Sequence, residues 1–274
     1  MLEAYPLVLI VAGLTAYAVL GGADFGAGFW SLWTGGPERH GRSLRDHAHR
    51  AMGPVWEANH VWLIFVLVVC WTGYPTAFGS IMSTLAVPLF IAAVGIILRG
   101  TAYALRVGAG TAPELRTVDL VFALSSVITP FAFGAAIGGI ASGRVPVGNA
   151  AGDTFSSWLN PTSLLVGVLA VAVAAYLAAV YLAADATRMG LADLAEDFRV
   201  RALATGVAAG VVAMAGLLVV RDDARQIWDG LTTGAGLGAV VVSALAGGAT
   251  MLLVWTRRYG PARAAAAARH SSRS

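Results

Sequence analysis

Three ionisable side chains lie inside stretches that are otherwise almost wholly apolar. Asp24 lies in "LGGADFGAGFW", Glu57 in "PVWEANHVWL" and Arg99 in "GIILRGTAYAL". Burying a charge in lipid is costly, so such residues are rare in membrane segments and indicate function by default. The arginine would keep one acid ionised by charge pairing, while the other acid could hold or pass a proton. The alternative is a structural cluster that pins three helices together.

Two more polar side chains follow Glu57 within one helical turn. They are Asn59 and His60, and the i, i+3 spacing puts His60 on the same helix face as Glu57. Both could extend a polar path that begins at Glu57. His60 could also be a haem ligand, but a lone membrane histidine beside an acid is more typical of a hydrogen-bonding partner.

The composition excludes an ordinary soluble domain. Hydrophobic residues make up 58% of the 274 residues and charged residues only 12%, whereas a soluble domain carries about 25% charged residues. The net charge of +3 is spread along the chain, which argues against a nucleic-acid partner. A single cysteine, Cys70, excludes an internal disulfide and a cysteine-rich metal site. The first three residues lack the basic start of a cleavable signal, so the first apolar stretch should remain as a membrane helix.

Apolar runs of about 20 residues predict membrane-spanning helices. The predicted fold class is therefore all-α, a polytopic membrane protein with about seven transmembrane helices. Thr117 and Asp119 are expected to open the fourth helix, where an acid suits the positive end of the helix dipole. The predicted spans cover residues 5–33, 55–73, 76–104, 117–141, 161–184, 199–220 and 231–255.

The arginines predict how the chain is oriented. All 18 basic residues are arginines, and with seven spans all but Arg144, Arg221 and Arg225 fall on one side of the membrane. Positive charge accumulates in cytoplasmic segments. The N-terminus is therefore predicted outside and the C-terminus in the cytoplasm.

This orientation brings the three ionisable residues to a similar depth. Asp24 lies about 13 Å before the inner end of the first span, at 1.5 Å per residue. Glu57 lies in the first turns of the second span, which starts at the cytoplasmic face. Arg99 lies about 8–10 Å before the inner end of the third span. The sequence thus predicts a polar cluster near the cytoplasmic face. The four glycines around Asp24 should allow close backbone approach and a bend or break in the helix.

Other polar residues have simpler interpretations. The histidines of the predicted cytoplasmic loop could suggest a metal site, but no acid or cysteine ligand set accompanies them, so solvated side chains are expected. Asp222 and Asp223 are expected to be surface charges of the last outer loop. The loop histidines are His40, His47 and His49.

The motifs resemble a known family. "GGADFGAGFW", a basic loop, "GPVWEANHVWLIFV" and "ILRGTAYALR" together look like subunit II of the cytochrome bd-type quinol oxidases. "SSVITPFAFGAAIGGIASGRVP" is similar to the fourth helix and outer loop of that family. The resemblance is specific over roughly residues 10–147. Beyond that range only hydrophobicity and helix placement agree.

The resemblance implies a partner and a reaction. The partner would be a larger haem-bearing subunit I, and the complex would oxidise membrane quinol and reduce dioxygen to water without pumping. Haems b and d would be bound by subunit I and none by this chain, which would be inactive alone. A small accessory subunit and a bacterial plasma membrane location are also implied. Asp24, Glu57 and Arg99 match the family's two motif acids and third-helix arginine, and imply part of a proton route from the cytoplasm.

The resemblance also implies a domain organisation. The family has eight helices in two four-helix bundles, whereas seven spans are counted here. The expected division is a first four-helix bundle with the polar cluster at 1–147 and a second bundle at 148–256 that lacks its last helix. A basic tail at 257–274 is expected to be disordered or to lie on anionic lipid.

Two other functions remain open. A stand-alone proton channel or secondary transporter would predict inverted repeats with broken helices in both halves, and the glycine-rich stretch around Asp24 has no counterpart in the last three spans. A membrane scaffold without a proton role is the other alternative. The favoured function is that of an oxidase subunit with membrane lipid and quinone as neighbours.

Overall fold

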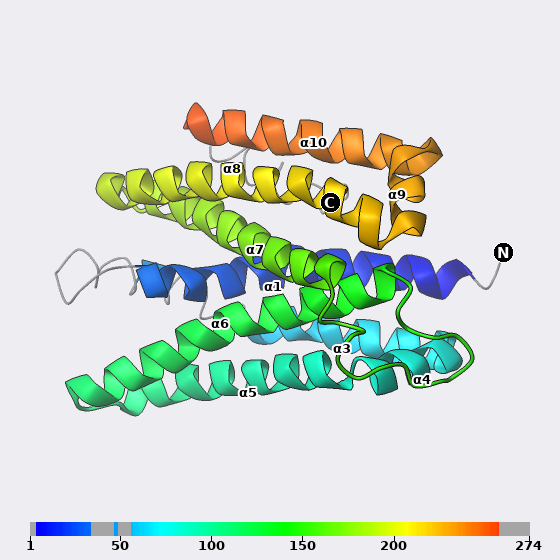
Figure 1. Ribbon diagram of the computed structural model, residues 1–274. Coiled ribbons are helices and arrows are strands. Elements are labelled where there is room, and N and C mark those ends of the chain that lie inside the picture. The colour runs from blue at the N-terminus through cyan, green and yellow to red at the C-terminus, as the bar shows by residue number, and fades with distance from the viewer. Residues whose placement is uncertain (1–3, 34–46, 49–55, 258–274) are drawn as a thin grey trace.

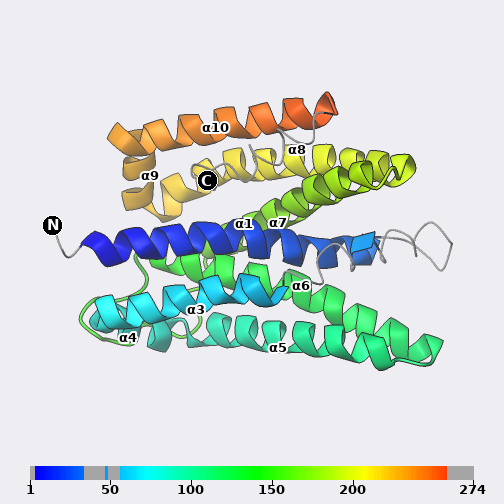
Figure 2. The ribbon, with the colours of Figure 1, turned by 180° about the vertical axis from the view of Figure 1, so that it is seen from behind.

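The computed structural model describes residues 4–33, 47–48 and 56–257, apart from the side chains of residues 56 and 57. Within these ranges the regular secondary structure is helical, and the axes of the long helices run roughly along one common direction (Figures 1 and 2). They are α1 (Tyr5–Trp33), α3 (Trp56–Gly73), α4 (Pro75–Thr84), α5 (Ala86–Gly108), α6 (Ala112–Ala141), α7 (Pro161–Arg188), α8 (Ala192–Asp223), α9 (Arg225–Thr232) and α10 (Gly234–Trp255).

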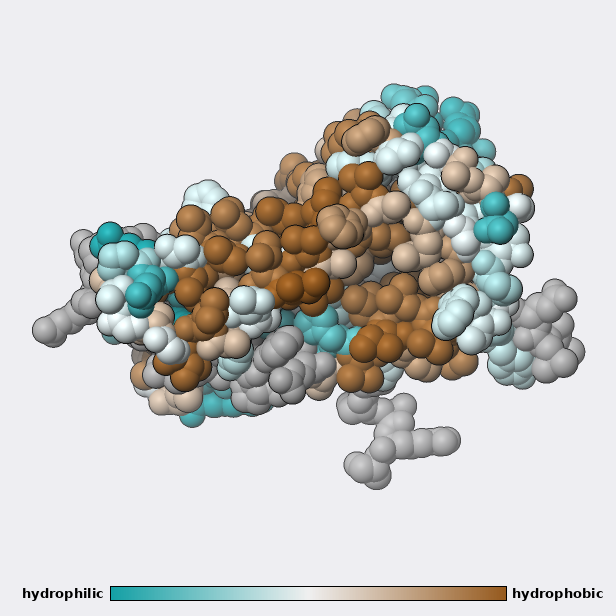
Figure 3. Space-filling model, turned by 90° about the horizontal axis from the view of Figure 1, so that it is seen from below, coloured by the Kyte–Doolittle hydropathy of each residue, from teal (hydrophilic) through white to brown (hydrophobic). Residues whose placement is uncertain are grey.

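These helices form a membrane-spanning protein. Among the described residues, α1, α5, α6, α7, α8 and α10 are long and apolar enough to cross a membrane. The shorter apolar stretch Ala58–Gly73 of α3 packs against α1. Seen from below, hydrophobic side chains cover the middle of the molecule between more hydrophilic ends (Figure 3). The prediction of an all-α fold with about seven spans is confirmed.

The third predicted span is divided into α4 and α5 at Leu85, although one continuous helix is expected over 76–104. Pro88 has no N–H with which to bond the carbonyl of Thr84, four residues earlier. That carbonyl instead accepts a hydrogen bond from Ser157 Oγ at 3.4 Å. The Thr84 hydroxyl also accepts a bond from the Gly152 N–H at 2.9 Å. The interruption is therefore the place where the loop between α6 and α7 attaches to the helices.

The fourth span begins earlier than expected. Thr111 and Glu114 form a reciprocal capping box, so α6 starts at Ala112 rather than near Thr117. Asp119 does not cap the helix; its Oδ1 lies 3.0 Å from Arg106 Nε on α5. The expectation that Asp119 opens the helix is wrong because a stronger capping sequence precedes it by two turns.

Small residues set the spacing between the central helices. α1 packs against α3, α6 and α7, while α5 packs against α6 and α8 against α7. A Cβ added at Gly26 of α1 would collide with the Ala174 carbonyl of α7, and one at Gly138 of α6 would lie 2.5 Å from Ser163 Cα. Such close approach is typical of membrane helix packing. α10 lies at the edge of the molecule beside α8 and α9 (Figures 1 and 2).

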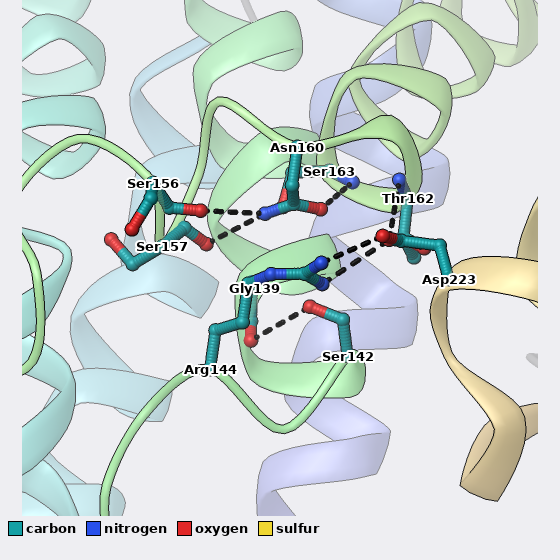
Figure 4. A network of polar contacts seen from close by, with 9 residues as sticks. All are labelled: Gly139, Ser142, Arg144, Ser156, Ser157, Asn160, Thr162, Ser163 and Asp223. Carbon is teal, nitrogen blue, oxygen red and sulfur yellow. Dashed lines mark hydrogen bonds and ion pairs between the residues drawn. The ribbon is translucent and has the colours of Figure 1, made fainter.

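A polar network connects α7, α8 and the loop between α6 and α7 (Figure 4). The Asp223 carboxylate at the end of α8 accepts bonds from Arg144 Nη2 at 2.6 Å and Nη1 at 3.2 Å. It also accepts bonds from the Thr162 hydroxyl at 2.5 Å and the Thr162 N–H at 3.1 Å. Asp223 is thus not a surface charge, since it joins α8 to the outer loop and to the first turn of α7.

A further correction concerns the predicted cytoplasmic loop. His47 is only 2% exposed, its Nε2 lying 3.3 Å from the Leu182 carbonyl and 3.8 Å from Asp185 Oδ2. Its ring also lies beside that of Phe198, with 6.0 Å between centroids. The expectation of a solvated side chain is wrong for His47, because the ends of α7 and α8 enclose it. The other two loop histidines lie outside the described residues.

Candidate functional site

An ion pair between Asp24 and Arg99 lies in the interior of the helix assembly. Arg99 Nη2 lies 2.6 Å from Asp24 Oδ1, and it also donates to the Asp24 carbonyl at 2.9 Å. Asp24 is 1% exposed and Arg99 is 3% exposed. Because α5 packs on α6 and α6 packs on α1, the long Arg99 side chain reaches past α6 to contact α1.

The rest of the Arg99 guanidinium is also enclosed. Nη1 donates to the Ser126 hydroxyl of α6, which donates in turn to the Phe122 carbonyl at 2.5 Å. The rings of Phe25 and Phe122 lie 5.0 Å and 4.3 Å from Arg99 Cζ. A buried cation needs both a counter-charge and satisfied donors, and aromatic faces add favourable cation–π contacts. These contacts hold the guanidinium in one orientation.

The glycines near Asp24 make room for this arrangement. Gly28 follows Asp24 by one turn on the same face of α1. A Cβ at Gly28 would collide with Ser126 Oγ and would lie 2.8 Å from Arg99 Nη1. α1 is nevertheless one continuous helix from Tyr5 to Trp33. The expected bend or break is therefore not found, and the glycines serve close approach to neighbouring side chains.

Asn59 and His60 line the contact between α1 and α3. Asn59 is 2% exposed and its Nδ2 donates to the carbonyl of Leu20, one turn before Asp24, at 3.2 Å. His60 is partly buried, and its ring lies 6.2 Å from that of Tyr17 and 6.4 Å from that of Phe25. Glu57 belongs to the first turn of α3, and its side chain lies outside the described residues.

The structure adds Ser126 to the site. In the sequence, Ser125, Ser126, Thr129 and Pro130 suggest only a kink with small-residue packing. One signal in the sequence could have identified Ser126. Two hydroxyl side chains, Ser126 and Thr129, interrupt an apolar helix at i, i+3 spacing. The spacing does not reveal that the partner of Ser126 is Arg99 of α5.

The arrangement is chemically suited to handling protons. Asp24 Oδ1 is occupied by Arg99, whereas Asp24 Oδ2 is buried without a hydrogen-bond partner among the described residues. A carboxyl group with one anchored oxygen and one oxygen open to bonding can exchange a proton without losing its position. The described ranges contain no group of three or more His, Cys, Asp or Glu side chains placed to hold a metal ion.

Comparisons with known proteins agree with the motif resemblance. The family model described as "Cytochrome bd terminal oxidase subunit II" matches residues 2–270. The chain is 27% identical over 127 residues to "Cytochrome bd ubiquinol oxidase subunit 2" of Bacillus subtilis (strain 168). That alignment covers 46% of this chain and 36% of the relative, so the chain matches about a third of the length of this curated protein.

A solved structure extends the likeness to the fold. A chain of "The structure of bd oxidase from Geobacillus thermodenitrificans" superposes with a TM-score of 0.72 and 25% sequence identity. The superposition covers 97% of this chain and 80% of that chain. The membrane-spanning helices, the motifs around Asp24 and Arg99 and the nearly complete family match lead to one assignment: the chain belongs to the cytochrome bd terminal oxidase subunit II family.

Proposed function

We propose that this chain is the non-haem subunit of a bd-type terminal oxidase in a bacterial plasma membrane. It would assemble with a larger subunit I that carries haems b and d. The complex would oxidise membrane quinol and reduce dioxygen to water. Family membership supports this proposal, together with the similarity to a Bacillus subtilis protein named as an oxidase subunit. The haems would supply electron transfer and oxygen binding, and this chain would support the partner.

We further propose that Asp24, Glu57, Arg99, Asn59 and His60 form part of a proton path from the cytoplasm. Water formation consumes protons inside a dry protein interior, where lipid cannot deliver them and buried carboxyl groups can. The observation that carries the proposal is the buried Asp24–Arg99 pair, in which one Asp24 oxygen is anchored at 2.6 Å and the other is left open.

Each residue has a distinct role in this path. Glu57, in the first turn of α3 at the predicted cytoplasmic end, would collect protons. Asn59 and His60 lie one turn or less beyond Glu57, and Asn59 holds α3 to the α1 backbone beside Asp24. Asp24 would receive the proton on Oδ2, while Arg99 keeps the carboxyl group in place through Oδ1.

The proposal is tested first at the level of the complex. The tagged chain is purified from native membranes in mild detergent, and a reduced-minus-oxidised visible spectrum is recorded. A larger haem-bearing polypeptide should co-purify and give haem bands. Recovery of a colourless chain alone from gently handled membranes would contradict the oxidase assignment and favour a stand-alone channel or transporter. The proton path is then tested by quinol-driven oxygen consumption of the Glu57→Gln complex.

A further inference from the structure

Within the described part of the chain, the hydroxyl groups of Tyr17 and Thr129 are buried without a hydrogen-bond partner, as is one carboxylate oxygen of Asp24. Tyr17 Oη, Thr129 Oγ1 and Asp24 Oδ2 are all buried, and none has a hydrogen-bond partner among the described residues. Tyr17 is 8% exposed and Thr129 is 0% exposed. Buried polar atoms are nearly always hydrogen-bonded, either to protein or to ordered water. These three oxygens lack the protein partner that buried polar atoms usually have, and ordered water is the other kind of partner that satisfies such atoms.

The Tyr17 ring is turned along α1 toward Asp24. Side chains on a helix usually lean toward its N-terminus. The Tyr17 ring lies instead over Gly21, where a Cβ would be 3.1 Å from Cε2 of the ring. The absence of a side chain at Gly21 permits this position. The Tyr17 ring also lies 6.5 Å, centroid to centroid, from the ring of Phe25, the residue that follows Asp24.

The Thr129 hydroxyl faces another helix instead of its own. Threonines in membrane helices commonly bond the carbonyl four residues earlier, as Thr72, Thr187 and Thr250 do here at 2.8 Å. Thr129 Oγ1 makes no such bond, and a Cβ at Gly95 of α5 would collide with it. Pro130, the next residue, cannot donate to the Ser126 carbonyl, which leaves that acceptor without its helical donor.

The two residues that carry these hydroxyl groups lie on the same side of the ion pair along their helices. Tyr17 precedes Asp24 by seven residues in α1, about 10 Å along the axis. Thr129 follows Ser126 by three residues in α6, about 4.5 Å along the axis. Because α1 and α6 run in opposite directions, both displacements point away from the predicted cytoplasmic end (Figure 1). Tyr17 and Thr129 therefore lie beyond Asp24 in the direction of the predicted middle of the membrane.

We propose that Tyr17 and Thr129 hold ordered water molecules that carry the proton path inward from Asp24 Oδ2. A hydroxyl group both donates and accepts hydrogen bonds. It can therefore accept a proton from one neighbouring water molecule and release its own proton to the next. Tyr17 and Thr129 are positioning residues, because each acts through the water that it orients. This inference rests on the proposed proton-path function and deepens it.

The test uses the complete complex with its haem-bearing partner. Thr129→Val removes the hydroxyl with little change in shape, Thr129→Ser keeps it, and Tyr17→Phe removes only the phenolic oxygen. Thr72→Val is the matched control, since the Thr72 hydroxyl bonds the carbonyl of its own helix on an exposed face. Proton uptake during quinol oxidation is followed with a pH-indicator dye, together with oxygen consumption in H2O and D2O.

Thr129→Val and Tyr17→Phe should each slow proton uptake about fivefold to tenfold, the effect of losing one hydrogen bond to the path. Both should also raise the solvent isotope effect on turnover. Thr129→Ser should restore the wild-type values, and Thr72→Val should match them. A purely structural role would make Thr129→Ser as defective as Thr129→Val or would leave the isotope effect unchanged, and either result overturns the inference.

Asp24→Asn, prepared in parallel, separates this inference from the function on which it rests. Slow uptake in Asp24→Asn with wild-type rates in both hydroxyl variants would overturn only the inward extension. Wild-type rates in all three variants would overturn the proton path itself. If Thr129→Val fails to assemble with the haem subunit, Tyr17→Phe decides by the same criteria, because its ring remains in place.

Discussion

Arg99 Nη2 lies 2.6 Å from Asp24 Oδ1 and 2.9 Å from the Asp24 carbonyl, so one side chain of α5 is fixed to both the side chain and the backbone of α1. The two residues are 75 positions apart in the sequence and both are almost fully buried. This contact ties the third predicted span to the first at the depth where the sequence concentrates its intramembrane charges.

Breaking the ion pair from one side should destabilise the protein strongly. Arg99→Leu leaves the Asp24 carboxylate buried without its counter-charge, a change that costs about 3–5 kcal/mol. The measurement is thermal unfolding of the purified complex, followed by loss of the haem spectrum. The double variant Asp24→Asn with Arg99→Leu should be more stable than Arg99→Leu alone, because no buried charge remains. Equal stability of the single and double variants would show that the pair is not coupled.

Replacing Glu57, the acid proposed to collect protons, should impair turnover without impairing assembly. Glu57→Gln retains size and hydrogen bonding but cannot carry a proton, so quinol-driven oxygen consumption should fall by about 10²-fold or more. The haem content of the purified complex should stay at the wild-type level. Glu114→Gln is the matched control, since Glu114 caps α6 outside the site and glutamine also suits that position. Wild-type turnover in Glu57→Gln would support the scaffold alternative instead.

A methyl group at Gly28 should disturb the site directly. Gly28→Ala would place a Cβ 2.8 Å from Arg99 Nη1 and into Ser126 Oγ. Overpacking of this kind typically costs about 1–3 kcal/mol. Thermal unfolding of the complex measures the loss. Gly210→Ala in α8 is the control, because its Cβ would enter open space and alanine in a helix is favoured over glycine by about 0.5–1 kcal/mol. A Gly28→Ala complex as stable as Gly210→Ala would contradict the close contact.

The outer network should hold the loop between α6 and α7. Asp223→Ala removes the acceptor shared by Arg144 and Thr162, and charge-assisted bonds of this kind are worth about 1.5–3 kcal/mol. Limited proteolysis of membranes should cleave the variant faster within residues 142–160. Arg225→Ala is the control, because its 3.7 Å pair with Asp229 is largely exposed and such pairs contribute at most about 1 kcal/mol. Equal cleavage of the two variants would show that the network does not restrain the loop.

The sequence by itself determines the membrane-spanning character of the protein. Long apolar runs cannot leave backbone groups unsatisfied in lipid, so they must form helices. The spacing of Thr111 and Glu114 is that of a capping box, but the fourth span is predicted to begin near Thr117, five positions after the observed first residue Ala112. Asp24 and Arg99 can also be selected from the sequence, because rise per residue and helix direction suffice to compare their depths in the membrane.

Only the tertiary structure decides which polar groups meet. In a membrane helix nearly every face is apolar, so the sequence carries little information on how each helix is rotated about its axis. The bond from Arg99 to Ser126 and the open position of Thr129 both depend on that rotation.

Loops add a second kind of contact that periodicity cannot predict. Ser157 satisfies the Thr84 carbonyl that Pro88 leaves open, and Asp223 pairs with Arg144 from a loop 79 residues away. These pairings join segments that are distant in sequence, and each is stable because burial favours satisfying every polar group that enters the interior. Local spacing therefore determines the helices and their direction, while packing in three dimensions determines the partners of their polar side chains.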